Sequence, residues 1–174
     1  MGPVGLNWGE MENQTTENMT PSAELAFGFT GNIALKLDTA QRVQVPARFK
    51  EVLDKRFGSS GGRVTVIPWG KRIVITPAEV WPKYQQEMEA MGGKFNSNAA
   101  RVRSLIVGQM DVIGLDGQGR IKLTPRMCDK VGLTKEVVLV GVGEQMELWD
   151  AQAWDEFSAV DLDTVLGATD GLQA

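Results

Sequence analysis

The chain has 174 residues, of which 43% are hydrophobic and 23% are charged, and this composition suits one globular domain or two small domains that share a core. Its only cysteine, Cys128, excludes an intramolecular disulfide and fits a reducing cytosol. The longest apolar run, Val137 to Val142, is too short to cross a bilayer, and no basic segment followed by an apolar core marks a signal peptide. We therefore expect a cytoplasmic protein without a membrane partner.

The formal net charge of −4 conceals an uneven distribution. Residues 1–30 contain four acidic residues and no Lys or Arg, and residues 150–174 contain six acidic residues and no Lys or Arg. All 18 Lys and Arg therefore lie in residues 31–149, beside 12 acidic residues, which gives this middle region a net charge of +6. A basic middle region indicates an anionic partner such as nucleic acid, although a basic core with solvating acidic tails explains the charges equally well.

The first 29 residues are acidic and lack hydrophobic periodicity, so we predict a largely disordered extension. A first structural unit is expected over residues 30–91. Alternating apolar and polar residues predict strands around Ile33 and Val43, with a helix that follows Pro46 and is closed by Gly58. The remaining elements of this unit are a hairpin with strands at 63–67 and 73–75, a capping box at Thr76 and Glu79, and a helix that Pro82 kinks or delays.

A linker with a short helix is expected over residues 92–106, where Ser97 can cap a helix that carries Val102 and Leu105. A second unit over residues 107–161 repeats the plan of the first. Its predicted elements are strands at 112–115 and 121–123, a short helix opened by Thr124 and Pro125 and ended by Gly132, strands at 136–142 and 146–149, and a final helix with Trp154 and Phe157. Residues 162–174 form an acidic tail that we expect to fray.

The two units echo each other in their polar and aromatic residues. Asp38, Arg42 and Arg48 return 78 positions later as Asp116, Arg120 and Arg126, and Trp81 and Tyr84 return 73 positions later as Trp154 and Phe157. The Gly/Ser-rich insertion at 58–62 absorbs the difference of five residues. Such a period indicates one supersecondary unit used twice. Because a single unit this small would leave sheet edges open, we expect the two copies to interlock in one barrel-like core with peripheral helices.

The sequence offers little support for catalysis. It contains no His, so the commonest general base and metal ligand is missing, and Cys128 has no His partner. Gly141 to Gly143 lacks the third glycine of a dinucleotide-binding turn, and the Gly58–Gly62 loop is not followed by the Lys-Ser or Lys-Thr of a phosphate loop. We expect no enzyme activity, no catalytic residue, no metal, no cofactor and no small-molecule substrate.

The duplicated turn is the stronger candidate for a binding site. In each copy an Asp precedes an Arg by four positions, so the carboxylate can orient the guanidinium or cap the turn through backbone N–H groups. The planar guanidinium suits phosphate and guanine edges because it donates two hydrogen bonds at once. The alternative, compatible with the first, is that each Arg pairs with its own Asp only to hold the turn. The bases that we expect to gather on one face are Arg42, Arg48, Lys50, Arg120, Lys122 and Arg126.

Three stretches of the second unit (116–125, 132–143 and 147–150) closely resemble the MraZ family of bacterial transcriptional regulators, which carry two AbrB/SpoVT-like units in one chain. The resemblance covers roughly residues 30–160 and is looser in the first unit. It implies a mixed β/α, mainly β fold, in which two interlocked swapped-hairpin units form one pseudo-dimeric barrel. It also implies closed rings that bind repeated DNA elements upstream of the division and cell-wall gene cluster. The family's Asp-x-x-x-Arg motif contacts DNA, which implicates Asp38 with Arg42 and Asp116 with Arg120.

One position departs from the family pattern. Gln41 stands where the second unit has Gly119, and a positive φ at this position would strain Gln41. Our hypothesis is a sequence-specific repressor that binds double-stranded promoter DNA, assembles into a ring and associates with the nucleoid. The alternative is a ring-forming scaffold that binds protein partners rather than DNA.

Overall fold

The computed structural model describes residues 27–58, 62–90 and 97–170. The predicted extension up to residue 26, the middle of the Gly/Ser-rich loop and residues 92–96 of the predicted linker lie outside the described residues. Among the helices that are described, none combines the length and the apolar character needed to span a membrane.

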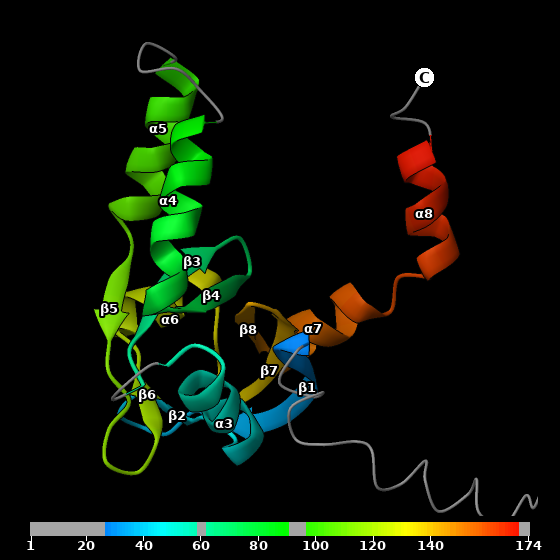
Figure 1. The fold of residues 1–174 in the computed structure, drawn as a ribbon. Helices are drawn as coiled ribbons and strands as arrows, with labels where there is room; N and C mark the ends of the chain where they lie inside the picture. Colours follow the sequence, from blue (N-terminus) through cyan, green and yellow to red (C-terminus); the bar gives the residue numbers. More distant parts are fainter. Residues whose placement is uncertain (1–26, 59–61, 91–96, 171–174) are drawn as a thin grey trace, which may run out of the picture.

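Eight strands form two antiparallel sheets in the described part of the chain (Figure 1). The larger sheet has six strands in the order β1-β7-β8-β4-β3-β5, and the smaller sheet consists of β2 and β6 alone. The strands are β1 Phe29–Lys36, β2 Arg42–Gln44, β3 Val64–Trp69, β4 Arg72–Pro77, β5 Asp111–Ile113, β6 Arg120–Lys122, β7 Glu136–Gly143 and β8 Gln145–Asp150. These pairings leave β1 and β5 as the edges of the larger sheet. The mixed, mainly antiparallel β/α architecture agrees with the expectation, and no closed barrel is found among the described strands.

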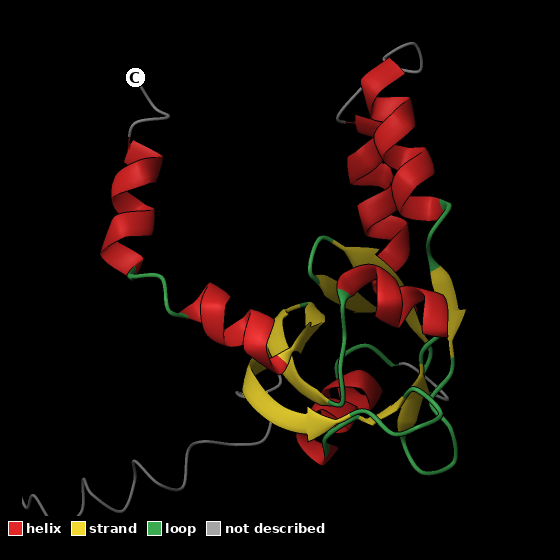
Figure 2. Cartoon of the chain, turned by 180° about the vertical axis from the view of Figure 1, so that it is seen from behind, coloured by secondary structure: helices red, strands yellow, loops and turns green. Residues whose placement is uncertain are grey.

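The helices lie around the sheets, and two groups of them project away from the body (Figures 1 and 2). Helices α4 and α5 stand side by side beyond the β3–β4 hairpin, and α8 extends past the end of α7. The helices are α3 Ala47–Lys55, the short 3₁₀ helix η1 Ala78–Val80, α4 Trp81–Ala90, α5 Ser97–Val107, α6 Pro125–Val131, α7 Ala151–Ser158 and α8 Leu162–Asp170. The helix predicted from Ser97 is therefore confirmed, whereas residues 162–170, which we expected to fray, are helical.

Of the helix starts predicted at Thr124 and at Thr76, the structure confirms the first and contradicts the second. Thr124 caps α6 by accepting a hydrogen bond from the backbone N–H of Met127 at 3.2 Å, and Gly132 ends that helix with φ +73°, as predicted. The capping box at Thr76 is wrong, because Thr76 is a buried residue of β4 and the helix after it has no side-chain cap. Pro82 is the second residue of α4, where its missing N–H breaks no helical hydrogen bond.

The two halves of the chain exchange their first strands. Strand β1 of the first half pairs with β7 of the second half, and β5 of the second half pairs with β3 of the first. The hairpins of the two halves meet along β4 and β8 in the middle of the sheet. If each strand is replaced by its counterpart in the other half, the strand order is the same when read from the opposite edge of the sheet.

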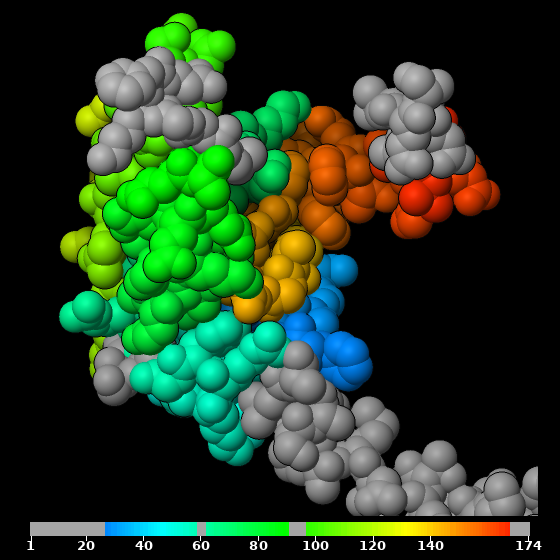
Figure 3. Space-filling model, turned by 45° about the horizontal axis from the view of Figure 1, so that its top comes forward, coloured from blue at the N-terminus to red at the C-terminus, as the bar shows by residue number. Residues whose placement is uncertain are grey.

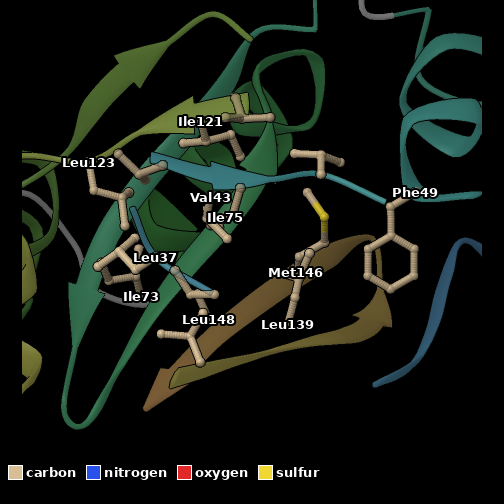
Figure 4. Close-up of a cluster of buried hydrophobic side chains, with 14 of the residues drawn as sticks. Leu37, Val43, Phe49, Ile73, Ile75, Ile121, Leu123, Leu139, Met146 and Leu148 are labelled. Carbon is tan, nitrogen blue, oxygen red and sulfur yellow. The ribbon is translucent and has the colours of Figure 1, made fainter. Parts of the chain in front are cut away.

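One hydrophobic core serves both halves (Figure 4). Val43 and Ile73 from the first half lie in the same cluster as Ile121 and Leu148 from the second, and each is 1% exposed or less. Neither half would bury these side chains without the other, because the strands that carry them pair across the two halves. The shared core fixes the position of the small β2–β6 sheet, which carries the residues of the duplicated turn.

Candidate nucleic-acid interface

The turn before β2 is held by the carboxylate of Asp38. Its Oδ1 accepts hydrogen bonds from the backbone N–H groups of Ala40 and Arg42 at 2.8 and 2.9 Å, and its Oδ2 accepts one from Arg42 Nε at 2.7 Å. These donors, the backbone N–H of Arg42 first among them, hold the pKa of Asp38 below its ordinary value. The pair engages Nε, the guanidinium nitrogen nearest the backbone, so the two Nη groups remain at the outer end of the side chain.

The turn before β6 repeats this geometry. Asp116 Oδ1 accepts from the backbone N–H groups of Gln118 and Arg120 at 2.9 and 3.0 Å, and Oδ2 accepts from Arg120 Nε at 2.8 Å. The backbone N–H of Arg120 is again the largest cause of the lowered pKa of Asp116. In both turns, therefore, the carboxylate caps the backbone and orients the guanidinium at the same time.

The two turns share a backbone conformation despite their different residues. Gln41 has φ +55°, and Gly119, at the equivalent position, has φ +76°. Gln41 is the only non-glycine residue with a positive φ among the described residues. The strain that we expected if this position had a positive φ is thus present in the first turn.

Strands β2 and β6 pair directly and bring the two turns together. Arg42 lies opposite Lys122, Val43 opposite Ile121, and Gln44 opposite Arg120. Because successive side chains on a strand point to opposite faces, the buried Val43 and Ile121 place the other four on the outer face. We call Arg42, Gln44, Arg120 and Lys122 the cationic ribbon.

Lys50 on α3 lies beside the cationic ribbon, next to the turn that precedes β6. An ideal Cβ at Gly119 would lie 3.7 Å from Lys50 Cδ and 3.9 Å from its Nζ, so the Lys50 side chain passes over this turn. Gln44 also ties the strands to this turn, because its Nε2 donates to the carbonyl oxygens of Gln118 and Gly119 at 3.0 and 3.2 Å. Gln44 was not among the site residues predicted from the sequence, although its alternation with Arg42 on one strand was a usable signal.

Arg48 and Arg126, equivalent residues of the two halves, make their contacts elsewhere. The guanidinium of Arg48 lies 5.1 Å from the centre of the Phe49 ring and beside Gly31 of β1. Arg126 lines a cavity of about 120 Å³ together with Met110 and Asp111. Of the six bases expected on one face, the structure therefore gathers Arg42, Lys50, Arg120 and Lys122.

Three further features of the described residues concern metal ligands, the thiol and a half-buried charge. The described residues contain no group of three or more Cys, Asp or Glu side chains that could hold a metal ion. Cys128 is 4% exposed, and its burial raises the pKa of the thiol. Arg72 lies 3.0 Å from the carboxylate of Glu147 and 5.2 Å from the centre of the Trp149 ring, which accounts for this half-buried charge. The contact of Arg72 Nε with Glu147 is off the N–H axis and is an ion pair rather than a hydrogen bond.

Comparison with known proteins finds similar sequences over most of the chain. Residues 107–166 match the family model MraZ, described as "MraZ protein, putative antitoxin-like". The chain is 33% identical over 144 residues to the "Transcriptional regulator MraZ" of Nitrosomonas eutropha, covering 82% of this chain and 92% of that protein. The relatives of the same name from Nitrosomonas europaea and Sodalis glossinidius are each 34% identical, over 147 and 150 residues, covering 82% and 83% of this chain and 92% and 97% of theirs.

Proposed function

Because the chain belongs to the MraZ family, whose relatives are named transcriptional regulators, we propose that it regulates transcription by binding double-stranded DNA. The cationic ribbon is the observation that supports this proposal. It presents two guanidinium groups held by carboxylates together with Lys122 on one outer face, and Lys50 of α3 lies beside it.

The shape of the ribbon suits the major groove of DNA, which admits a two-stranded β-ribbon. Like charges lie directly opposite each other at Arg42 and Lys122, an arrangement that is unfavourable in a free sheet and favourable beside a polyanion. We assign base contacts to Arg42 and Arg120, since their Nη groups can pair with guanine. Lys50 and Lys122 are assigned to phosphates, with Arg48 and Arg126 as further candidates on flanking surfaces.

The exchange of first strands supports a second part of the proposal. We infer that the two halves are AbrB/SpoVT-like swapped-hairpin units that form a pseudo-dimer within one chain. Each chain then carries two motifs, and a closed ring of chains multiplies them. Linked sites raise avidity by roughly 10²–10⁴ where the spacing of the DNA repeats matches that of the ring.

The same family membership supports a proposal about the biological role. We propose a repressor that acts in the nucleoid, at the promoter of the division and cell-wall gene cluster, through repeated operator elements. The acidic segments at both ends of the chain repel DNA, so binding is directed to the basic middle region.

A fluorescence-anisotropy titration tests the proposal. The protein is titrated against its own upstream promoter duplex and a scrambled duplex at two salt concentrations. We expect tight binding to the promoter that falls by about 0.9 log units per log unit of salt for each neutralised phosphate. Equal and negligible binding to both duplexes would overturn the proposal and favour a scaffold for protein partners.

A further inference from the structure

Helix α8 carries an exposed apolar face. Leu162, Val165 and Leu166 have the spacing i, i+3 and i+4, which places them on one side of the helix. They are 72%, 49% and 56% exposed, and α8 extends away from the sheets beyond α7 (Figures 1 and 3). An apolar face of this kind on a projecting helix marks a contact surface.

A groove of matching character lies beside α5, a helix that stands apart from α8 (Figures 1 and 2). It is a cavity of about 330 Å³ beside α5 and the end of β3, and its lining includes Ile67, Trp69, Val102 and Leu105. Trp69 is 48% exposed, Val102 49% and Leu105 53%. Apolar side chains at the rim of a groove next to a helix form the usual receptor for the apolar face of another helix.

The two surfaces are also complementary in charge. Asp161 and Asp163 flank the first residue of the apolar face of α8, and the chain has no Lys or Arg after residue 149. Helix α5 carries Arg101 and Arg103 and no acidic residue, and Lys130 lines the groove. Opposite charges around an apolar contact favour one partner and one orientation.

We propose that α8 of one copy docks into the α5 groove of a second copy. Within one copy helices α5 and α8 lie apart (Figures 1 and 2), because α7 is fixed on β8 and only residues 159–161 join it to α8. Asp150 caps α7, and Phe157 stacks on Trp149 with ring centroids 4.7 Å apart. The contact joins two different surfaces, so it propagates from copy to copy and closes into a ring where the rotation allows.

This inference rests on the self-association proposed above and names the surfaces that produce it. The test measures molar mass by light scattering for the wild type, Val165→Glu on α8, Val102→Glu in the groove, and Val112→Glu as a control. Val112 is an equally exposed valine on β5, outside both surfaces. We expect an oligomer for the wild type and for Val112→Glu, and the 19.0 kDa monomer for each of the other two variants.

Mixing the two monomeric variants gives the sharper result. Val165→Glu retains an intact groove and Val102→Glu retains an intact α8. The α8 of Val102→Glu can therefore still dock into the groove of Val165→Glu, and no other contact of this kind remains. We expect a mixture of the two to form a dimer and nothing larger. Contact between two α8 helices would leave Val102→Glu oligomeric on its own, and docking of α8 within its own chain would leave the mixture monomeric. Either result would overturn the proposal.

The other outcomes separate this inference from the proposals beneath it. An oligomer that persists in Val165→Glu overturns the named surfaces and leaves self-association standing. A monomeric wild type overturns both. DNA binding is measured independently by anisotropy on each variant, and unchanged thermal melting confirms that the substitutions act on the surface rather than on folding.

Discussion

Val43 and Ile121 face each other as direct partners across β2 and β6, and they occupy the same position in the two halves of the chain, 78 residues apart. A second pair of equivalent residues, Val74 and Glu147, meets across β4 and β8 with an offset of 73 residues. At these two pairs, equivalent residues of the two halves lie directly opposite each other, as expected at a pseudo-twofold relation between the halves. The turns of Asp38 and Asp116 therefore lie at equivalent positions on either side of the Val43–Ile121 pair.

Replacement of either ribbon arginine should weaken DNA binding without unfolding the protein. Arg42→Ala and Arg120→Ala each remove a guanidinium that carries about 1–3 kcal/mol of binding free energy. The melting temperature should change little, because both ion pairs are partly exposed. Anisotropy and thermal denaturation check both statements, with Lys36→Ala as the control, since Lys36 is an exposed base on β1. Loss of the thermal transition would instead show that the arginines serve only to hold the turns.

Replacement of Asp116 by asparagine should separate its two roles. In Asp116→Asn the new amide oxygen can still accept the backbone N–H groups of Gln118 and Arg120, while the ion pair with Arg120 Nε is lost. We expect near-normal stability and a lower ratio of promoter binding to scrambled-duplex binding, because the guanidinium is no longer oriented. Competition titrations with the two duplexes measure this ratio. An unchanged ratio would remove Asp116 from the specificity mechanism.

Gln41→Gly should stabilise the protein. The positive φ of Gln41 costs roughly 1–2 kcal/mol in a non-glycine residue, and glycine returns about 0.5–1 kcal/mol of that as unfolded-state entropy. The expected gain in the free energy of unfolding is about 0.5–1 kcal/mol, measured by urea denaturation. Gly119→Ala is the reverse control and should destabilise the second turn, where the new Cβ would also lie 3.3 Å from Gln44 Nε2.

Asp150 should make stability depend on pH in the acid range. Burial raises the pKa of its carboxyl, but hydrogen bonds from the hydroxyl and backbone N–H of Thr134, at 2.6 and 3.0 Å, outweigh burial and leave the pKa below the ordinary 3.8. A lowered folded-state pKa stabilises the protein above about pH 4, and this contribution disappears as pH falls through the lowered value.

The matched variant for this prediction is Asp150→Asn. At pH 7 it should lose about 1–3 kcal/mol of the free energy of unfolding, and the difference from the wild type should shrink as the pH falls below about 4. Denaturation by urea at a series of pH values measures the difference. A constant difference at all pH values would show that ionisation of Asp150 contributes nothing to folding.

Several short strands and helix ends could be predicted from residues close together in the sequence. The alternation around Val43 and Ile121, the cap at Thr124 and the end of α6 at Gly132 need only neighbouring residues, and the structure has all of them. The same kind of signal failed at Thr76, because burial against the sheet competed with a helix cap and prevailed. In residues 162–170, acidic composition suggested fraying, but an apolar helical face was also present.

The repeat could be predicted from the sequence because two stretches 78 residues apart carry the same residue types. The Asp-Arg turns and the buried face of each short strand could also be predicted, since they depend on residues within a few positions of one another. Only the tertiary structure decided that β2 pairs with β6, that Lys50 reaches the Gly119 turn, and that Arg48 and Arg126 lie apart from the ribbon. Hydrophobic periodicity predicts which face of a strand is buried, but it does not predict which distant strand pairs with it. That choice is made by the shared core, where side chains from both halves are buried only when the strands interlock.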